Sequence, residues 1–381
     1  AQSYGARDKA GVKAVIQNVC LLTTVVSLIF MFLGFASAEW LLRMMRTPQE
    51  VFVPAVGYLK VFLGTIPGMF GLFLVAAILR GVGDSVTPLK FQAGALLLAA
   101  ILDPLFMFGW LGMPRLELNG TAVAAVISQG LSLIGLIAFL RWKNHEGAPR
   151  WRWIPNLPLV WTMLKIGVPS MFQQALVSVG VLVLMGLVNG FGKDGAAAFG
   201  AAGRIDQFAF LPAMSIGIAV SSMVGQNIGA NRLDRVKRIF WWGIGLSLGL
   251  TSFATLIAMG CPGVILKMFT QDPEVIQIGV NYLRIAGIGY LLFSVLFASN
   301  GVINGTGHTM ATTFFSLIGL WVVRLPLATY LSRSMNKIEG IWLAVVISSA
   351  VGMSLSLAYF FSGRWKTPVG AVKIAGPLSA K

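Results

Sequence analysis

The sequence predicts an all-α integral membrane protein built from two pseudo-symmetric lobes, and three observations support this prediction. Of the 381 residues, 56% are hydrophobic and only 11% are charged, whereas soluble domains have about 25% charged residues. The apolar residues gather in stretches of about 20, the length that crosses a bilayer as a helix. Several segments also recur at a fixed spacing along the chain. A soluble domain, a disordered chain and a secreted disulfide scaffold are therefore excluded.

Ten apolar segments are long enough to span the membrane. Polar, Gly-rich or Pro-containing loops separate them, such as GDSVTP at residues 83–88. The expected spans cover residues 14–36, 55–79, 88–108, 120–140, 164–188, 196–224, 239–264, 275–303, 311–331 and 341–361.

The basic residues predict which side of the membrane is cytoplasmic. The net charge is +16, and the Lys and Arg residues lie mainly in short loops rather than on one polar face. Eighteen of them fall on the side that holds both chain ends, and seven fall on the opposite side. The positive-inside rule then places both ends in the cytoplasm. A multi-pass protein of a bacterial inner (plasma) membrane is expected, and a nucleic-acid partner is not.

An internal repeat divides the chain. The segment YGARDKAGVK at Tyr4 returns as IGANRLDRVK at Ile228, and VGYLKVFLG at Val56 returns as VNYLRIAGI at Val280. A third pair, RGVGDSVT and NGTGHTMA, has the same offset of 224 residues. That offset covers six helices, an even number, so the two halves run in the same direction through the membrane.

The repeat also predicts the domain boundaries. Residues 1–140 form an N-terminal lobe, 141–163 a cytoplasmic linker, 164–363 a C-terminal lobe of six helices, and 364–381 a cytoplasmic tail. The first two helices of the second lobe find no counterpart in the first. We therefore expect two further helices upstream of Ala1, with twelve spans in the intact molecule.

Several motifs resemble the multidrug and toxic compound extrusion (MATE) family. They are QSYGARDK, LRGVGDSVTP, ILDPLFMFG, NGTAVAAVIS, IGVPSMFQQ, VGQNIGAN and VVRLPLA, in the family's order. The resemblance implies two six-helix lobes around a central cavity. It also implies a monomer without a cofactor that exports small organic, often cationic, compounds by antiport with protons or sodium. The same superfamily contains flippases for lipid-linked sugars, which is the alternative function.

The resemblance also indicates the coupling ion. The sodium-coupled, NorM-like branch has two acidic residues in its C-terminal lobe, and Val177 and Phe293 stand in those places here. DinF-like members have an aspartate that matches Asp103 and a threonine that matches Thr121, although Ala99 replaces an asparagine of their pattern. The resemblance therefore implies a protein closer to the DinF-like branch, with Asp103 and Thr121 as proton-coupling residues.

Asp103 is a candidate on physical grounds as well. It lies deep in an apolar segment, where a bare carboxylate costs several kcal/mol and usually serves a function. One carboxylate that binds either a proton or a cationic cargo would couple their movements. A structural hydrogen-bonding role beside Pro104 is the alternative.

Three residues of the second lobe are candidates for cargo binding. Asp206 and Arg204 lie two residues apart and so do not share a helix face, and Gln173 follows the helix-starting Pro169. Asp206 could equally neutralise Arg204 or Arg324, and Gln173 could bond another helix. Lys60 and Arg284, at equivalent repeat positions, are expected to extend toward the membrane interface.

The sequence lacks the residues that an enzyme or a pump would need. Cys20 and Cys261 lie in or beside apolar segments, and His145 and His308 lie in loops, so a metal site is not expected. The GVGD and GTGH turns lack the Lys-Ser/Thr of a phosphate-binding loop. Transport is therefore expected to be secondary.

Overall fold

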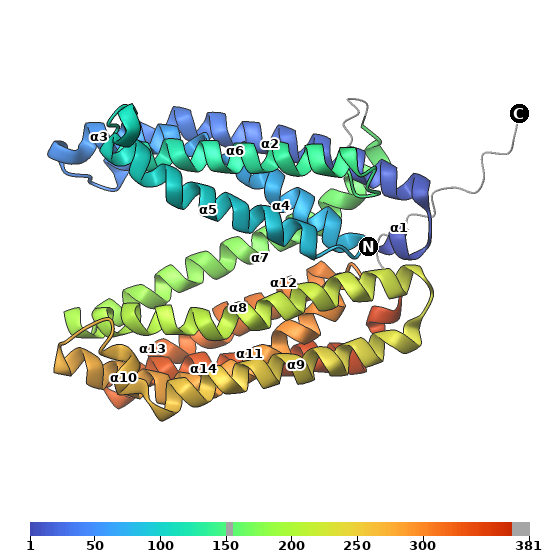
Figure 1. Ribbon diagram of the computed structural model, residues 1–381. Helices are drawn as coiled ribbons and strands as arrows, with labels where there is room; N and C mark the ends of the chain where they lie inside the picture. Colours follow the sequence, from blue (N-terminus) through green and yellow to red (C-terminus); the bar gives the residue numbers. More distant parts are fainter. Residues whose placement is uncertain (150–154, 368–381) are drawn as a thin grey trace, which may run out of the picture. The chain divides into compact units, whose positions relative to one another are not determined.

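The computed structural model describes residues 1–149 and 155–367, and the described chain is helical throughout. It divides into two compact units, one formed mainly by residues 7–161 and the other mainly by the residues from 162 on (Figure 1). The expected C-terminal tail, residues 364–381, lies mostly outside the described residues.

The first unit contains four membrane-spanning segments. Its elements are α2 (Lys9–Met44), α3 (Gln49–Leu63), α4 (Ile66–Gly81), α5 (Val86–Phe108), the 3₁₀ turn η1 (Trp110–Gly112) and α6 (Leu118–Trp142). The short helix α1 (Gln2–Gly5) groups mostly with the second unit.

The second unit contains six membrane-spanning segments. Its elements are α7 (Leu157–Asn189), α8 (Lys193–Gly229), α9 (Leu233–Gly260), α10 (Pro262–Leu266), α11 (Pro273–Gly305), α12 (Thr309–Leu317), the π-helical turn η2 (Ile318–Arg324), α13 (Leu325–Met335), α14 (Glu339–Phe361) and the 3₁₀ turn η3 (Arg364–Lys366).

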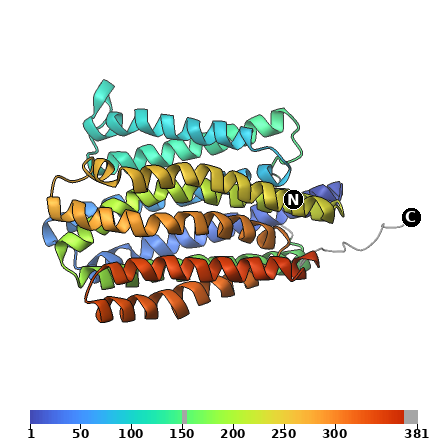
Figure 2. The same cartoon turned by 90° about the horizontal axis from the view of Figure 1, so that it is seen from below.

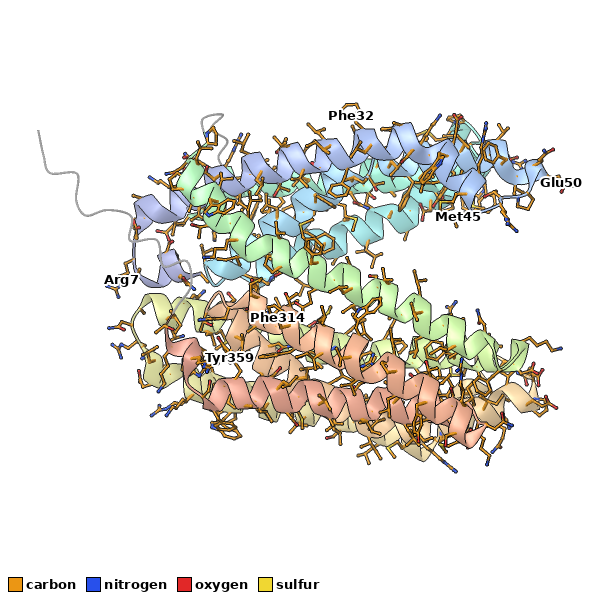
Figure 3. All side chains as sticks on the ribbon, turned by 180° about the vertical axis from the view of Figure 1, so that it is seen from behind. Arg7, Phe32, Met45, Glu50, Phe314 and Tyr359 are labelled. Carbon is orange, nitrogen blue, oxygen red and sulfur yellow. The ribbon has the colours of Figure 1, made fainter. Side chains whose placement is uncertain are left out.

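The ten predicted spans are confirmed within the described residues. Each is long and apolar enough to cross a bilayer, and many large apolar side chains point outward. Phe32 of α2, for example, is 63% exposed and projects away from the helices (Figure 3). Such surfaces suit lipid, because hydrocarbon tails solvate apolar side chains as well as a protein core does.

The backbone confirms the predicted repeat with the predicted offset. The helices α2 and α9 begin at Lys9 and Leu233, and α4 and α11 end at Gly81 and Gly305, each pair 224 residues apart. Left-handed residues recur at the same offset: Arg7 and Asn231 have φ of 57° and 56°, and Gly83 and Gly307 have φ of 92° and 90°. Two independent chain segments thus adopt the same turns at the same places.

Two spans differ from the continuous helices that hydropathy suggests. The expected span 55–79 consists of α3 and α4, which are separated at Gly64 and Thr65, and Pro67 near the start of α4 has no N–H to extend the helical ladder. The span that contains Pro326 is interrupted by the π-helical turn η2, which ends at Arg324, two residues before this proline. A proline clashes with the carbonyl four residues earlier, and widening the turn relieves this clash.

The helix α7 begins earlier than its apolar pattern. It starts at Leu157, within the expected linker, because the side chain of Asn156 accepts a hydrogen bond from the backbone N–H of Leu159 at 3.3 Å. An asparagine in this position caps the free N–H groups of a helix start. Asn156 was visible in the sequence as a possible helix cap, but it precedes the apolar residues from which the span 164–188 was predicted.

The second unit is built around α11. This helix packs against α8, α9 and α14, and Figure 2 shows it between them. Small residues bring α8 and α11 together, because a Cβ added at Gly301 would lie 2.5 Å from the carbonyl oxygen of Gly217. Close backbone approach at glycines is a common way for helices to associate in membranes.

A charged cap orders the turn before α5. Both Oδ1 hydrogen bonds of Asp84 come from the backbone, from Val86 N–H at 3.1 Å and Thr87 N–H at 3.0 Å. The His145 ring lies 3.6 Å from Oδ2. Partial burial raises the pKa of Asp84, but the hydrogen bonds from Thr87 and Val86 and the nearby His145 outweigh it, so its pKa lies below the usual value.

Replacing Asp84 by alanine is therefore expected to destabilise the first unit by about 0.5–2 kcal/mol near neutral pH. Because folding lowers the pKa of this carboxyl, its stabilisation is complete above the unfolded-state value and is lost as the pH falls through the folded-state value. The melting temperatures of the two proteins should differ at neutral pH and converge in acid. A difference that does not depend on pH would contradict the role of the charged cap.

Candidate functional site

The second unit contains a buried carboxylate held by two tyrosines. Asp206 of α8 is 9% exposed, and its two carboxylate oxygens accept hydrogen bonds from the hydroxyls of Tyr282 and Tyr290, each at 2.5 Å. The tyrosines are eight residues apart on α11, which is about 12 Å along the helix axis. Asp206 therefore lies between them, with a donor on either side.

Aromatic rings enclose this group. Tyr282 packs edge-on against Trp342 of α14, with 4.7 Å between ring centroids, and against Phe199 of α8 at 5.8 Å. Tyr290 packs edge-on against Phe210 of α8 at 5.6 Å. Trp342 and Tyr290 are 0% and 1% exposed. The carboxylate thus lies in a tightly packed, apolar interior.

The nearby arginine has its own partners. Arg324, at the end of η2, donates from Nε to Ser348 Oγ at 2.8 Å and from Nη2 to Ser349 Oγ at 3.4 Å. Both serines belong to α14 and donate in turn to the Val345 carbonyl. The guanidinium is therefore bound by neutral hydroxyls.

Neither arginine forms an ion pair with Asp206 among the described residues. Arg204, one of the predicted partners, is exposed on α8. The structure therefore contains a buried carboxylate and a half-buried guanidinium in one unit, and the side chains hydrogen-bonded to each are neutral hydroxyls.

Gln173 forms the interhelical hydrogen bond that was the alternative to cargo binding. Its Nε2 donates to Ser316 Oγ of α12 at 2.6 Å. This side chain is therefore already engaged between α7 and α12, two spans of the same unit, and lies apart from the Asp206 contacts.

Asp103 lies in the first unit, 17 residues after the start of α5 and so about 26 Å along the helix axis. It is half-buried. Its carboxyl has no hydrogen-bond or ion-pair partner in the part of the chain that the structure describes.

Thr121 lies at the beginning of α6, which packs along α5. A Cβ added at the neighbouring Gly120 would lie 2.5 Å from the backbone of Phe106, three residues beyond Asp103. The hydroxyl of Thr121 donates to the Leu118 carbonyl of its own helix at 2.9 Å. The two predicted coupling residues therefore lie on adjacent helices near one level, without a hydrogen bond between them.

The two basic residues at equivalent repeat positions differ. Lys60 forms an ion pair with Glu39 of α2, with 2.9 Å between Nζ and Oε1, whereas Arg284 is exposed on α11. The pair of Lys60 is partly exposed and adds little stability.

Sequence reasoning missed the partners of Asp206. Tyr282, Tyr290 and Trp342 were not among the candidates, although a carboxylate in an apolar span needs hydrogen-bond donors and tyrosine hydroxyls can supply them. A row of buried hydroxyls on one face of α9 was missed as well. It consists of Ser247, Thr251 and Thr255, none of which has a hydrogen-bond partner among the described residues. Their spacing of four residues was readable in the sequence.

The potential metal-ligating side chains of the described residues are dispersed. No group of three or more His, Cys, Asp or Glu side chains comes together within residues 1–149 and 155–367.

Comparisons with known proteins agree with this architecture. The sequence profile of the MatE family matches residues 1–105 and 169–330. The probable multidrug resistance protein YpnP of Bacillus subtilis is 31% identical over 370 residues, which cover 96% of this chain and 81% of that protein. The probable multidrug resistance protein NorM of Thermotoga maritima is 26% identical over 371 residues, covering 96% and 79%.

A solved structure shows the same fold. The Vibrio cholerae MATE transporter VcmN in its bent form superimposes with a TM-score of 0.88 at 20% identity, over 96% of this chain and 82% of that one. The profile match, the relatives and the shared two-lobe fold lead to one conclusion: the chain belongs to the MatE family of multidrug transporters.

Proposed function

We propose that this protein is a secondary active exporter of small organic compounds that exchanges its cargo for protons by alternating access of two lobes. The observation that supports the proposal most directly is that Asp103 lies inside a span without a protein partner among the described residues. Its carboxyl is half-buried. An ionisable group in such a place is costly unless it binds something during the working cycle.

In the proposed cycle, deprotonated Asp103 attracts a cationic cargo, and Thr121 lies on the adjacent helix α6. A proton from outside then replaces the cargo, and the neutral side chain returns toward the cytoplasm. Because one carboxyl binds either the proton or the cargo, each outward cargo step requires an inward proton. The cargo family is inferred from the relatives, which are named multidrug resistance proteins.

The surroundings of Phe293 favour protons over sodium. This position corresponds to an acidic residue of the sodium-coupled branch, and here its ring packs against Phe210 with 4.7 Å between centroids. Such a setting offers no oxygen ligand to sodium. We therefore infer that its coupling ion is that of the DinF-like branch. Two of its relatives are nevertheless named NorM.

Reconstitution of the full-length protein tests this function. An imposed pH gradient across protein-containing vesicles is expected to drive accumulation of a cationic dye such as ethidium, and a proton ionophore should abolish it. A sodium gradient alone should drive none. Accumulation driven by sodium would overturn the coupling ion, and lipid scrambling that needs no gradient would indicate the flippase function instead.

A further inference from the structure

The enclosed carboxylate of Asp206 belongs to the other unit and has no part in the cycle proposed for Asp103. We propose that Asp206, together with Tyr282 and Tyr290, forms a second proton-binding site, located in the C-terminal unit. This inference goes beyond the coupling role of Asp103 and does not depend on it.

The packing around Asp206 limits what can bind there. The carboxylate and both tyrosines are at most 9% exposed, and ring contacts of 4.7 to 5.8 Å surround them. An organic cation does not fit between rings in such contact. A metal cation would need more oxygen ligands than one carboxylate and two phenols, and the aromatic and aliphatic side chains packed around them supply none. A proton needs no additional space.

The charges around Asp206 leave its ionised form poorly compensated. Arg324 interacts electrostatically with Tyr282, but serine hydroxyls bind it. Arg204 and Arg284 are exposed. The charged residues of α9 lie in its first two turns, and the one charged residue of α14, Glu339, is at its start and bonded to Asn281. A buried carboxylate with no ion pair is costly, and protonation removes that cost.

The two tyrosines can serve both protonation states. A phenol hydroxyl donates to a carboxylate oxygen, and after rotation it accepts from a carboxylic acid O–H. When a proton arrives from water and bonds to one carboxylate oxygen, the tyrosine on that side turns from donor to acceptor. No heavy atom needs to move, so the interior stays packed while its charge changes by one.

The alternative is a purely structural role for Asp206, Tyr282 and Tyr290. A permanently ionised Asp206 would act as an anchor between α8 and α11, with the tyrosines always donating. The two roles differ in one measurable property, which is whether the carboxyl changes its protonation with pH.

Infrared difference spectroscopy of the full-length protein in lipid measures this property directly. A C=O stretch of a carboxylic acid is expected to disappear on going from mildly acidic to alkaline pH, and Asp206→Asn should lack that band. Tyr282→Phe and Tyr290→Phe each remove one donor to the charged form. In both, the band should persist to higher pH and shift in frequency because a hydrogen bond to the acid is lost.

Controls separate this result from other carboxyls and from the proposed function. Glu274→Gln changes an exposed carboxyl at the start of α11 and should leave the band unchanged, and Asp103→Asn should leave it as well. If Asp206→Asn does not fold, the two tyrosine variants still retain the carboxyl and report on it. Spectra that show no pH-dependent band lost in Asp206→Asn, or none shifted in either tyrosine variant, would overturn the proposal. If the unmodified protein shows this band but no proton-driven dye transport, the result would instead count against the function proposed for Asp103.

Discussion

Replacing Asp103 by asparagine is expected to reduce proton-driven dye accumulation to the level of vesicles without protein. Asparagine has nearly the same shape as aspartate but neither binds a proton at physiological pH nor attracts a cation. The fold should tolerate the change, because the carboxyl has no hydrogen-bond or ion-pair partner among the described residues. The initial rate of dye uptake under a fixed pH gradient measures the effect, and the melting temperature shows that the protein is intact.

Two variants sharpen this test. Asp103→Glu restores a carboxyl one methylene further from the backbone and should recover part of the rate. Glu274→Gln removes an exposed carboxyl at the start of α11 and should transport as well as the unmodified protein. Full transport by Asp103→Asn would refute the coupling role of this residue, whatever its position in α5.

Replacing Gly301 by valine is expected to destabilise the second unit strongly. A Cβ at this position would lie 2.5 Å from the Gly217 carbonyl oxygen and 3.1 Å from the Val220 side chain. The helices α8 and α11 would have to separate, and overpacking of this kind costs about 1–3 kcal/mol. Because Asp206 and its tyrosines lie on the same two helices, their hydrogen bonds should weaken together.

A matched glycine provides the control. Gly245 of α9 has open space around the position of an added Cβ, so Gly245→Ala should leave the melting temperature unchanged or raise it slightly, since alanine is the better helix former. The temperature at which half of the detergent-solubilised protein remains monodisperse on size-exclusion chromatography measures both variants. Equal stability of Gly301→Val and Gly245→Ala would contradict the close approach of α8 and α11.

Hydropathy and repetition were enough to predict the helices and their pairing across the repeat. The spans follow from the need to satisfy every backbone hydrogen bond within the bilayer. The predicted offset of 224 residues recurs in the helix starts at Lys9 and Leu233 and in the turns at Gly83 and Gly307, although the expected spans began at residues 14 and 239. Hydropathy could not predict the division between α3 and α4 or the π-helical turn η2. Mean hydropathy over 20 residues does not respond to a local break in a helix. Pro67 and Pro326 were the local signals.

For the candidate site, too, the sequence predicted one part and the tertiary structure decided the other. The sequence by itself determined that Asp103 and Asp206 lie within membrane-spanning helices, because so few charged residues interrupt the apolar segments. Only the tertiary structure decided that Asp206 meets Tyr282 and Tyr290 rather than Arg204 or Arg324. Which side chains meet depends on how two helices rotate and slide against each other, and close packing at small residues such as Gly217 and Gly301 sets that register. That helix contact brings Tyr282 and Tyr290 to Asp206, although they lie 76 and 84 positions away in the chain. No local sequence pattern encodes such a contact.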